Sequence, residues 1–382
     1  MDLPVYLDYA ATTPCDPEVV RFMLPFFGEK FGNPASRYHR HGWEAEEAVN
    51  TARTEVARLI GAKPGEICFT SGATESSNLA IRGILKGDLK GRNHIITLAT
   101  EHKCVLETLH QLEKDGFSVT YIRVNRKGMP DLQELEEAFR FETALVCAMY
   151  ANNETGMIMP VREIAALSKK HGVAYFCDAT QAVGKKAVEV SSEGMDMMAF
   201  TAHKMYGPKG IGALYIRGGI YSTHLKALIT GGSQEGGLRG GTLNVPGIVG
   251  FGEASRLCRI QLLEESAQII EHQRDMEDAL TCIPGVILNG DVQHRLPHIT
   301  NISVEGVDSE RLLLHLSSKL ALGSGSACSS ITREPSHVLQ AMGIEGDLLN
   351  GSIRISLGRF TTNEQIRFAI SELTKAIAHL RH

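Results

Sequence analysis

Short apolar runs alternate with longer amphipathic stretches between residues 45 and 260 of the chain. The runs are rich in β-branched and aromatic residues, which is typical of strands. We expect strands over seven ranges: 66–70, 94–98, 119–124, 143–149, 173–177, 196–201 and 211–216. Between them, 45–61 and 161–172 repeat apolar residues with the period of a helix, and each ends at a glycine. This alternation predicts βαβ units around a mostly parallel sheet.

The pattern changes beyond residue 253, where a long helix is expected over 253–280. After it we expect strands at 285–290, 298–306 and 351–358 and helices at 309–320 and 363–380. These elements predict a smaller α+β domain, so the fold class is α/β with a large, mostly parallel-sheet domain and a second domain. We place the large domain at 15–260 and the small domain at 1–14 and 261–382.

The composition is that of an ordinary globular protein. The chain has 382 residues and 43% hydrophobic content, which is enough to bury a large core. Its 39 basic and 44 acidic residues are spread along the chain, which argues against direct binding to nucleic acid or to an anionic membrane. No apolar run approaches the length of a membrane span, and the N-terminus lacks the pattern of a secretory signal. We therefore expect a cytoplasmic protein.

Eight cysteines are scattered through the sequence without a C-x-x-C pair or a Cys/His cluster at metal spacing. A disulfide framework and a metal site are therefore not expected. Cys68, Cys147 and Cys177 lie in apolar runs, and we interpret the cysteines in general as small buried hydrophobes. Cys328 is the exception, because small, flexible residues surround it in "LGSGSACSS".

Polar residues follow several of the expected strands, at the edge where an open α/β sheet binds its ligands. The segment "SGATESSN" at 71–78 opens a helix whose free N–H groups suit a phosphate. His102 and Asn153 each follow another strand. Taken singly, these features are more typical of ordinary turns and caps, because no P-loop or dinucleotide motif is present.

Asp178 and Lys204 turn this pattern into a chemical hypothesis. Asp178 ends a very apolar strand, where a carboxylate is costly unless a cation or hydrogen-bond donor meets it. Lys204 follows the next strand in a turn that contains glycine and proline. A lysine there can form a Schiff base with pyridoxal 5'-phosphate (PLP), while an aspartate keeps the pyridine nitrogen protonated. With the phosphate turn and His102, the pair predicts a cofactor site.

Ten motifs in order carry a family resemblance. They are "YLDYAATTPCDP", "FGNPASRYHRHGWEAEEAV", "FTSGATESSNLAIRG", "EHKCVLE", "NNETG", "DATQAVG", "TAHKMYGPKGIGALYIR", "LRGGTLNVP", "GSACSS" and "SIRISLGRFTT". The chain resembles the NifS/IscS-type cysteine desulfurases, PLP enzymes of the class V aminotransferase family with the aspartate aminotransferase-like fold. The "GSACSS" segment is similar to the group of these enzymes with a long, mobile cysteine loop, which we place at about 322–335.

The resemblance implies a role for each matching residue. Lys204 would hold PLP, Asp178 would pair with its ring nitrogen, Gln181 would bind its phenolic oxygen, and His102 would act as acid and base.

The resemblance also implies how the phosphate and the substrate are held. The phosphate would be bound by Ala73, Thr74, Thr201, His203 and, from the partner subunit of a homodimer, Thr242. Arg354 with Asn33 would hold the substrate carboxylate, because a guanidinium can donate two parallel hydrogen bonds. Asn153 would line the pocket for both cofactor and substrate.

Cys328 gives this site a specific reaction. The substrate would be L-cysteine, and the thiolate of Cys328 would attack its sulfur, which leaves a persulfide on the enzyme and releases alanine. The persulfide must then reach a protein acceptor, and the glycines and serines at 323–326 give the backbone freedom for that movement.

Alternatives remain open at this point. Another PLP enzyme of the same fold, such as a selenocysteine lyase or a small-amino-acid aminotransferase, would need Lys204 but have no use for Cys328. A non-catalytic chain that keeps the fold is a third possibility. The glycine-dense stretch 231–242 is expected to be an irregular loop, and it carries Gly236 where the family commonly has arginine.

The acceptor is also open. The sequence ends at His382, where many iron–sulfur-type relatives continue. Acceptors for iron–sulfur assembly, tRNA thiolation and DNA phosphorothioation are therefore comparable candidates.

Overall fold

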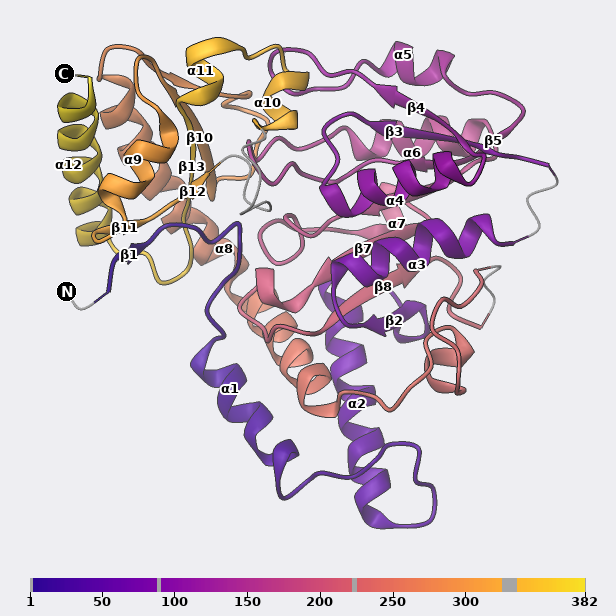
Figure 1. The fold of residues 1–382 in the computed structure, drawn as a ribbon. Helices are drawn as coiled ribbons and strands as arrows, with labels where there is room; N and C mark the ends of the chain where they lie inside the picture. The colour runs from indigo at the N-terminus through magenta and orange to yellow at the C-terminus, as the bar shows by residue number, and fades with distance from the viewer. Residues whose placement is uncertain (1–2, 88–90, 222–224, 325–334, 382) are drawn as a thin grey trace.

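The computed structural model describes residues 3–87, 91–221, 225–324 and 335–381 (Figure 1). Cys328 and most of the expected cysteine loop lie outside the described residues. No helix in the described part of the chain is long and apolar enough to cross a membrane.

A mixed sheet of seven strands forms the centre of the larger part of the molecule. In spatial order the strands are β2 (Ile67–Thr70), β8 (Gly212–Ile216), β7 (Met197–Thr201), β6 (Ala174–Asp178), β5 (Thr143–Cys147), β3 (His94–Leu98) and β4 (Ser118–Ile122). β8 runs antiparallel to both of its neighbours, and the other pairs are parallel. All seven expected strands are present, with ends that differ by at most two residues.

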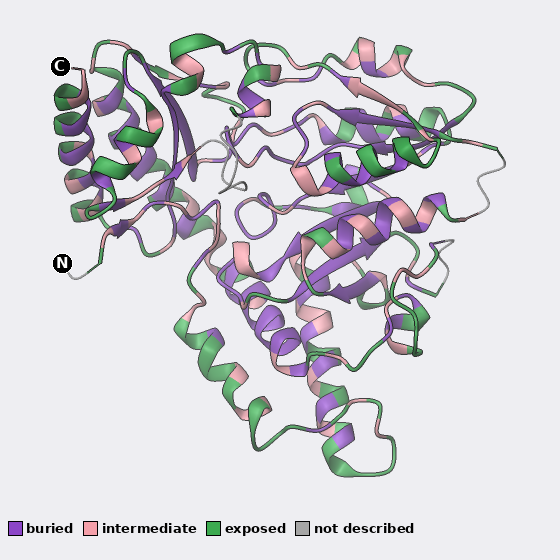
Figure 2. Cartoon of the chain, in the orientation of Figure 1, coloured by how far each residue is buried: buried purple, intermediate pink, exposed green. Residues whose placement is uncertain are grey.

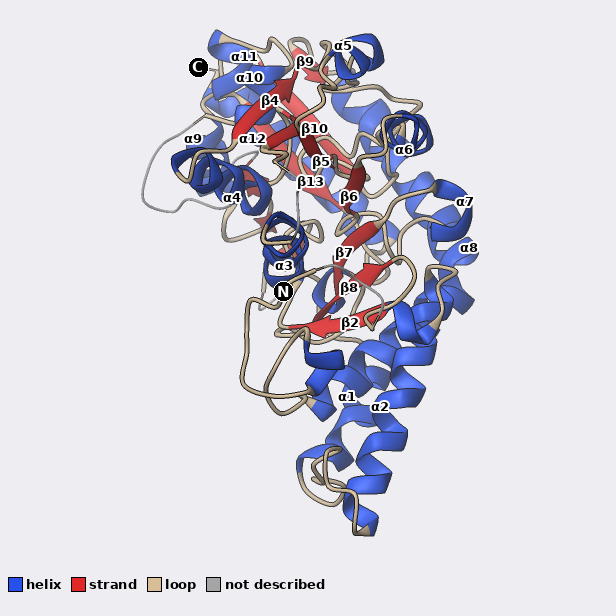
Figure 3. Cartoon of the chain, turned by 90° about the vertical axis from the view of Figure 1, so that its right-hand side faces the viewer, coloured by secondary structure: helices blue, strands red, loops and turns tan. Residues whose placement is uncertain are grey.

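Helices cover both faces of this sheet (Figure 3). One face carries α3 (Ala73–Leu85) and α4 (Lys103–Lys114), and the other carries α6 (Val161–Lys170), α7 (Val190–Glu193) and α8 (Val245–Thr281). Successive strand residues point to opposite faces, so Ile95 packs with α3 and α4 while Ile96 packs with the opposite core. The strands are therefore apolar throughout, as expected of a sheet buried on both sides. The short helix α5 (Leu132–Glu137) follows β4.

A second sheet lies beyond α8, with its own hydrophobic core. Its order is β12 (Gly323–Ser324), β13 (Ser352–Ser356), β10 (Ile299–Val304) and β9 (Val286–Leu288), all antiparallel. A two-stranded parallel sheet joins β1 (Val5–Tyr6) to β11 (Leu320–Ala321). The helices of this part are α9 (Ser309–Leu316), α10 (His337–Ala341), α11 (Gly346–Asn350) and α12 (Asn363–Leu380). The predicted fold class is thus confirmed, whereas the predicted domain boundaries stay a prediction.

The helix α8 begins eight residues before the expected 253 and includes three glycines in that extension. Glycines argue against a helix in a sequence, but here they permit close packing. A Cβ at Gly252 would lie 2.5 Å from the Cα of Ala52 on α2 (Arg40–Leu59). The helix also runs continuously through residue 260, where we placed the domain boundary.

A helical arm extends from the large domain. It contains α1 (Pro17–Met23), the 3-10 turn η1 (Leu24–Phe27) and the first turns of α2, and its surface is mostly exposed (Figure 2). Large apolar side chains remain exposed along it: Val20, Phe22, Leu24, Phe27, Phe31, Tyr38 and Trp43.

The prediction for the cysteines is right in part. Four of the described cysteines are buried: Cys68, Cys147, Cys177 and Cys258. Cys282, at the C-terminal cap of α8, is exposed, and Cys15 and Cys104 are only half-buried. The expected loop at 231–242 is confirmed, apart from the short 3-10 turn η4 (Gln234–Gly237).

Candidate active site

A cavity of about 570 Å³ opens at the carboxyl ends of β3, β5, β6 and β7. Parallel neighbours bring residues from distant parts of the chain to this edge. The lining includes these residues named from the sequence: Ala73, Thr74, His102, Asn153, Asp178, Gln181, Thr201, His203, Lys204 and Arg354. Cys328 lies outside the described residues, and Asn33 and Thr242 are exposed and do not line the cavity.

Lys204 ends the short 3-10 turn η3 (Ala202–Lys204), which follows β7 directly. Its Nζ donates hydrogen bonds to the carbonyl oxygens of Ala10 (2.5 Å) and Ala11 (2.6 Å) in the N-terminal segment. The side-chain amide of Gln181 donates to the same Ala10 oxygen at 3.0 Å. The N-terminal segment therefore holds the amine at the wall of the cavity.

Asp178, His102 and Cys104 form a compact group, whose ligand atoms all lie within 4.8 Å of one another. Asp178 accepts a hydrogen bond from the Thr180 N–H at 3.0 Å, and the Cys104 thiol lies 3.9 Å from its other oxygen. Burial and the Asp178 charge raise the pKa of the Cys104 thiol, which keeps it protonated. Among the described residues this is the one group with donors close enough to hold a metal ion, and it lies in the cavity itself.

His102 caps α4, and its Nδ1 accepts a hydrogen bond from the Cys104 N–H at 3.1 Å. In the neutral ring the proton is therefore on Nε2. Burial lowers the pKa of His102, while the nearby Asp178 carboxylate acts in the opposite direction. An imidazole in this balance can both accept and donate a proton.

The N-terminus of α3 forms another wall of the cavity. The first N–H groups of a helix have no acceptor within it, so those at Ala73 and Thr74 are available to an anion. Arg239 from the glycine-rich loop pairs with Glu75 in the first turn of α3 at 2.9 Å, which ties that loop to this end of the helix. Gly236 in the loop adopts a φ of +65°, a conformation in which arginine would be strained.

Arg354 on β13 is buried and faces the cavity from the second sheet. Its guanidinium donates to the Asn153 carbonyl and to the Asp8 carboxylate, each at 2.8 Å. Its Nε is buried and has no hydrogen-bond partner among the described residues. A buried guanidinium with unused donor capacity suits a carboxylate ligand.

Glu154 follows Asn153 and was not named from the sequence as a site residue. Its carboxyl accepts a hydrogen bond from the Ser336 hydroxyl, close to where the described chain resumes at residue 335. The next residue, His337, contacts the Glu101 carbonyl at 2.9 Å through Nε2. The segment that begins at residue 335 is therefore attached beside the residues that precede His102 and follow Asn153.

The residues present fit three functional groups of PLP. The amine of Lys204 suits its aldehyde, the Asp178 carboxylate suits its ring nitrogen, and the N-terminus of α3 suits its phosphate. His203 also lines this end, and burial, with the charges of Lys204 and Lys209, lowers its pKa to about 4. The ring is therefore neutral at physiological pH. Its Nδ1 shares a hydrogen bond with Thr12 Oγ1 at 3.1 Å, whose direction depends on the tautomer.

Sequence reasoning missed Cys104 and Lys209 as members of the cavity. Cys104 lies two residues after His102 at the start of a helix, and this short spacing was the available signal. Lys209 belongs to the turn after Lys204. The sequence shows this second lysine but does not show that it lines the cavity.

Comparisons with known proteins agree with this geometry. The family model for aminotransferase class-V matches residues 5–368. The chain is 48% identical over 383 residues to the cysteine desulfurase IscS of Escherichia coli O139:H28, covering 100% of this chain and 94% of the relative. A solved structure titled as a NifS-like protein matches with a TM-score of 0.93 and 35% identity, over 99% of this chain and 100% of the other. The structure of SspA in complex with cysteine matches with a TM-score of 0.82 and 36% identity, over 94% and 100% of the chains. The chain therefore belongs to the aminotransferase class-V family and, within it, to the cysteine desulfurases.

Proposed function

We propose that this enzyme uses PLP to remove sulfur from L-cysteine, releasing L-alanine and leaving a persulfide on Cys328. One observation carries the proposal. A single cavity gathers the amine of Lys204, the carboxylate of Asp178, the N-terminus of α3 and the buried guanidinium of Arg354. The similarity to a structure of SspA in complex with cysteine supports the choice of substrate.

Each residue has a role that follows from its chemistry. When bound, PLP supplies a conjugated ring that accepts electrons from the substrate and weakens its Cβ–S bond. Lys204 would hold the cofactor and Asp178 its ring nitrogen. Gln181 would bind its phenolic oxygen, and Asn153 would line the pocket beside it.

The phosphate would lie at the N-terminus of α3. Ala73 and Thr74 would bind it through the helix N–H groups, and Thr201 and His203 would complete the site from the end of β7.

The substrate needs a carboxylate partner and a base. Arg354 would hold the carboxylate, which requires it to share or exchange its contact with Asp8. Lys204 would move the proton at the substrate Cα, and His102 would donate or accept a proton at the reacting end. The Cys328 thiolate would form an S–S bond with the substrate sulfur as the Cβ–S bond breaks.

We also propose that the active form is a homodimer in the cytoplasm. The exposed apolar side chains on the arm are typical of an interface, because a monomer rarely leaves such a patch in water. Thr242 and Asn33 are exposed and outside the cavity of their own chain, so a second copy would bring them to a site. The free cysteines of the described chain suit a reducing compartment.

The first experiment is single-turnover mixing of the PLP-loaded protein with L-cysteine, followed by intact-mass analysis of wild type and Cys328→Ala. We expect the wild type alone to gain one sulfur atom, with about one alanine released per site. Equal alanine formation by both proteins would assign the chain to another PLP reaction.

The same persulfidated protein can identify the acceptor. Candidate proteins for iron–sulfur assembly, tRNA thiolation or DNA phosphorothioation would be added, and loss of the added mass would be followed. We expect one of these acceptors to remove the sulfur. Retention of the sulfur with all three would contradict the proposed transfer.

A further inference from the structure

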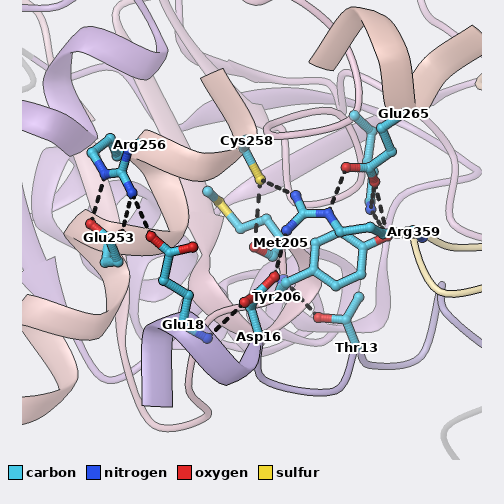
Figure 4. Close-up of polar contacts among 11 residues, drawn as sticks. Thr13, Asp16, Glu18, Met205, Tyr206, Glu253, Arg256, Cys258, Glu265 and Arg359 are labelled. Atoms are coloured by element: carbon cyan, nitrogen blue, oxygen red, sulfur yellow. Dashed lines mark hydrogen bonds and ion pairs between the residues drawn. The ribbon is translucent and has the colours of Figure 1, made fainter. Parts of the chain in front are cut away.

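A buried polar cluster surrounds Tyr206, in the turn that follows Lys204, and none of its residues lines the cavity (Figure 4). We define it by Asp16, Lys185, Tyr206, Glu265 and Arg359 and call it the Tyr206 cluster. Its side chains are almost removed from water: Lys185 is 4% exposed, Glu265 7% and Arg359 12%. Two cations and two carboxylates balance one another, which is the condition for burying charges at all.

Tyr206 is the centre of this cluster and lies two residues after Lys204. Its φ is +63°, a left-handed conformation that is unusual for a bulky residue and persists only where the surroundings enforce it. The backbone is held on both sides by the N-terminal segment. The Tyr206 N–H donates to Thr13 Oγ1 at 2.7 Å, and the Asp16 N–H donates to the Tyr206 carbonyl at 2.9 Å.

The Tyr206 side chain is held just as firmly. Its hydroxyl accepts from Lys185 Nζ and from the Arg359 N–H, each at 2.7 Å, and donates to Glu265 at 2.9 Å. Two cations contact its ring, with Lys185 Nζ 3.9 Å and Arg359 Cζ 4.1 Å from the centroid. The turn that carries Lys204 therefore has little freedom to move.

Arg359 connects this turn to the second sheet. It lies five residues after Arg354, between β13 and α12. Its guanidinium pairs with Asp16 and with Glu265 on α8, both at 2.9 Å. One residue thus joins the N-terminal segment, the Lys204 turn, α8 and the strand that presents Arg354.

We propose that Arg359 and Tyr206 are positioning residues that set the separation between Lys204 and Arg354. This rests on the proposed function, in which the substrate must meet the cofactor held by Lys204 and the guanidinium of Arg354 together. None of the cluster residues lines the cavity, so the cluster would act through the backbone of the two segments. A change in the cluster is therefore expected to alter the KM for the substrate and the absorbance spectrum of the bound cofactor.

The test compares Arg359→Met, Arg359→Lys and Tyr206→Phe with the matched control Arg256→Met. Arg256 also pairs with two carboxylates, those of Glu18 and Glu253, but it is more exposed than Arg359. In Figure 4 its group meets the cluster through the Glu18 backbone N–H, which donates to Asp16 and does not involve the Arg256 side chain. For each protein we would measure kcat and KM for L-cysteine, the absorbance spectrum of the bound cofactor and the midpoint of thermal unfolding.

We expect Arg359→Met to lower kcat/KM for L-cysteine by about 100-fold, the cost of a misplacement of about 1 Å, with most of the change in KM because Arg354 would bind the substrate carboxylate. The cofactor spectrum should shift as well. Arg359→Lys should recover part of both effects, Tyr206→Phe should show them more weakly, and Arg256→Met should show neither.

A lower unfolding midpoint with wild-type KM and spectrum in Arg359→Met would overturn the proposal, as would equal effects in Arg256→Met. If Arg359→Met does not fold, Tyr206→Phe and Arg359→Lys decide by the same criteria. If wild type binds PLP but makes no alanine from L-cysteine, the proposed function fails. The cofactor spectrum of the variants then decides whether the cluster positions Lys204.

Discussion

Glu154 follows the cavity residue Asn153 and is hydrogen-bonded to Ser336, in the segment that begins at residue 335. It is almost fully buried, it accepts a hydrogen bond from Ser336, and the Arg354 and Lys103 charges act on it. Burial raises its pKa from 4.5 to about 7, although these partners act in the opposite direction. The carboxyl is thus close to half-protonated at neutral pH.

This pKa predicts a pH-dependent stability. A carboxyl whose pKa is raised by folding adds stability that is full below pH 4.5 and is lost as the pH rises through about 7. The unfolding free energy of wild type relative to Glu154→Gln should fall by up to about 3 kcal/mol between pH 5 and pH 8, since each pKa unit is worth about 1.4 kcal/mol. Urea unfolding across this range measures it. Glu163→Gln, on the exposed face of α6, is the control. If the difference in unfolding free energy between wild type and Glu154→Gln is as independent of pH as that for Glu163→Gln, the prediction is contradicted.

At the scale of elements, the glycine-rich loop depends on one buried ion pair. Glu235 is buried beside β2, where it pairs with Arg53 of α2 at 2.5 Å and accepts from the Phe69 N–H at 2.8 Å. The guanidinium of Arg53 also lies over the Phe69 ring at 4.6 Å. A loop that the sequence marks only as irregular is therefore attached to the core at a defined point.

Removing one partner of this pair should be costly. Arg53→Met leaves the Glu235 carboxylate buried without its cation, which we expect to lower the free energy of unfolding by about 3–5 kcal/mol. Arg40→Met removes an exposed pair with Glu44 on the same helix, and its effect should stay below about 1 kcal/mol. Chemical denaturation of both variants gives the comparison. Similar losses of unfolding free energy in the two variants would contradict the prediction that the buried Arg53–Glu235 pair is costlier to break than the exposed one.

At the scale of the whole molecule, the helical arm exposes large apolar side chains that the packing of a single chain does not bury. Phe27 and Phe31 are 66% and 67% exposed, although side chains of this size normally lie inside. A second copy that covers them would remove this apolar area from water and complete the site with Thr242 and Asn33.

Sedimentation velocity tests the proposed dimer. Wild type should sediment as two copies, and Phe27→Glu combined with Phe31→Glu should sediment as one, because buried glutamates without partners oppose association. Phe141→Glu, which is 84% exposed and lies outside the arm, should leave the dimer intact. A wild type that sediments as a single copy would remove the basis for assigning Thr242 to a partner.

The sequence by itself determined the strands of the large sheet, the helices α2, α6 and α12 and the residues at the strand ends, because the periodicity of buried positions is a local property. Asp178 and Lys204 could be named for this reason, since each ends or follows a very apolar run. Only the tertiary structure decided which distant residues meet. Arg354 contacts Asp8 across nearly the whole chain, Tyr206 is enclosed by Arg359 and Lys185, and Cys104 lies against Asp178. Such contacts depend on the order of strands in the sheet and on close packing between helices, and neither of these leaves a periodic signal in the sequence.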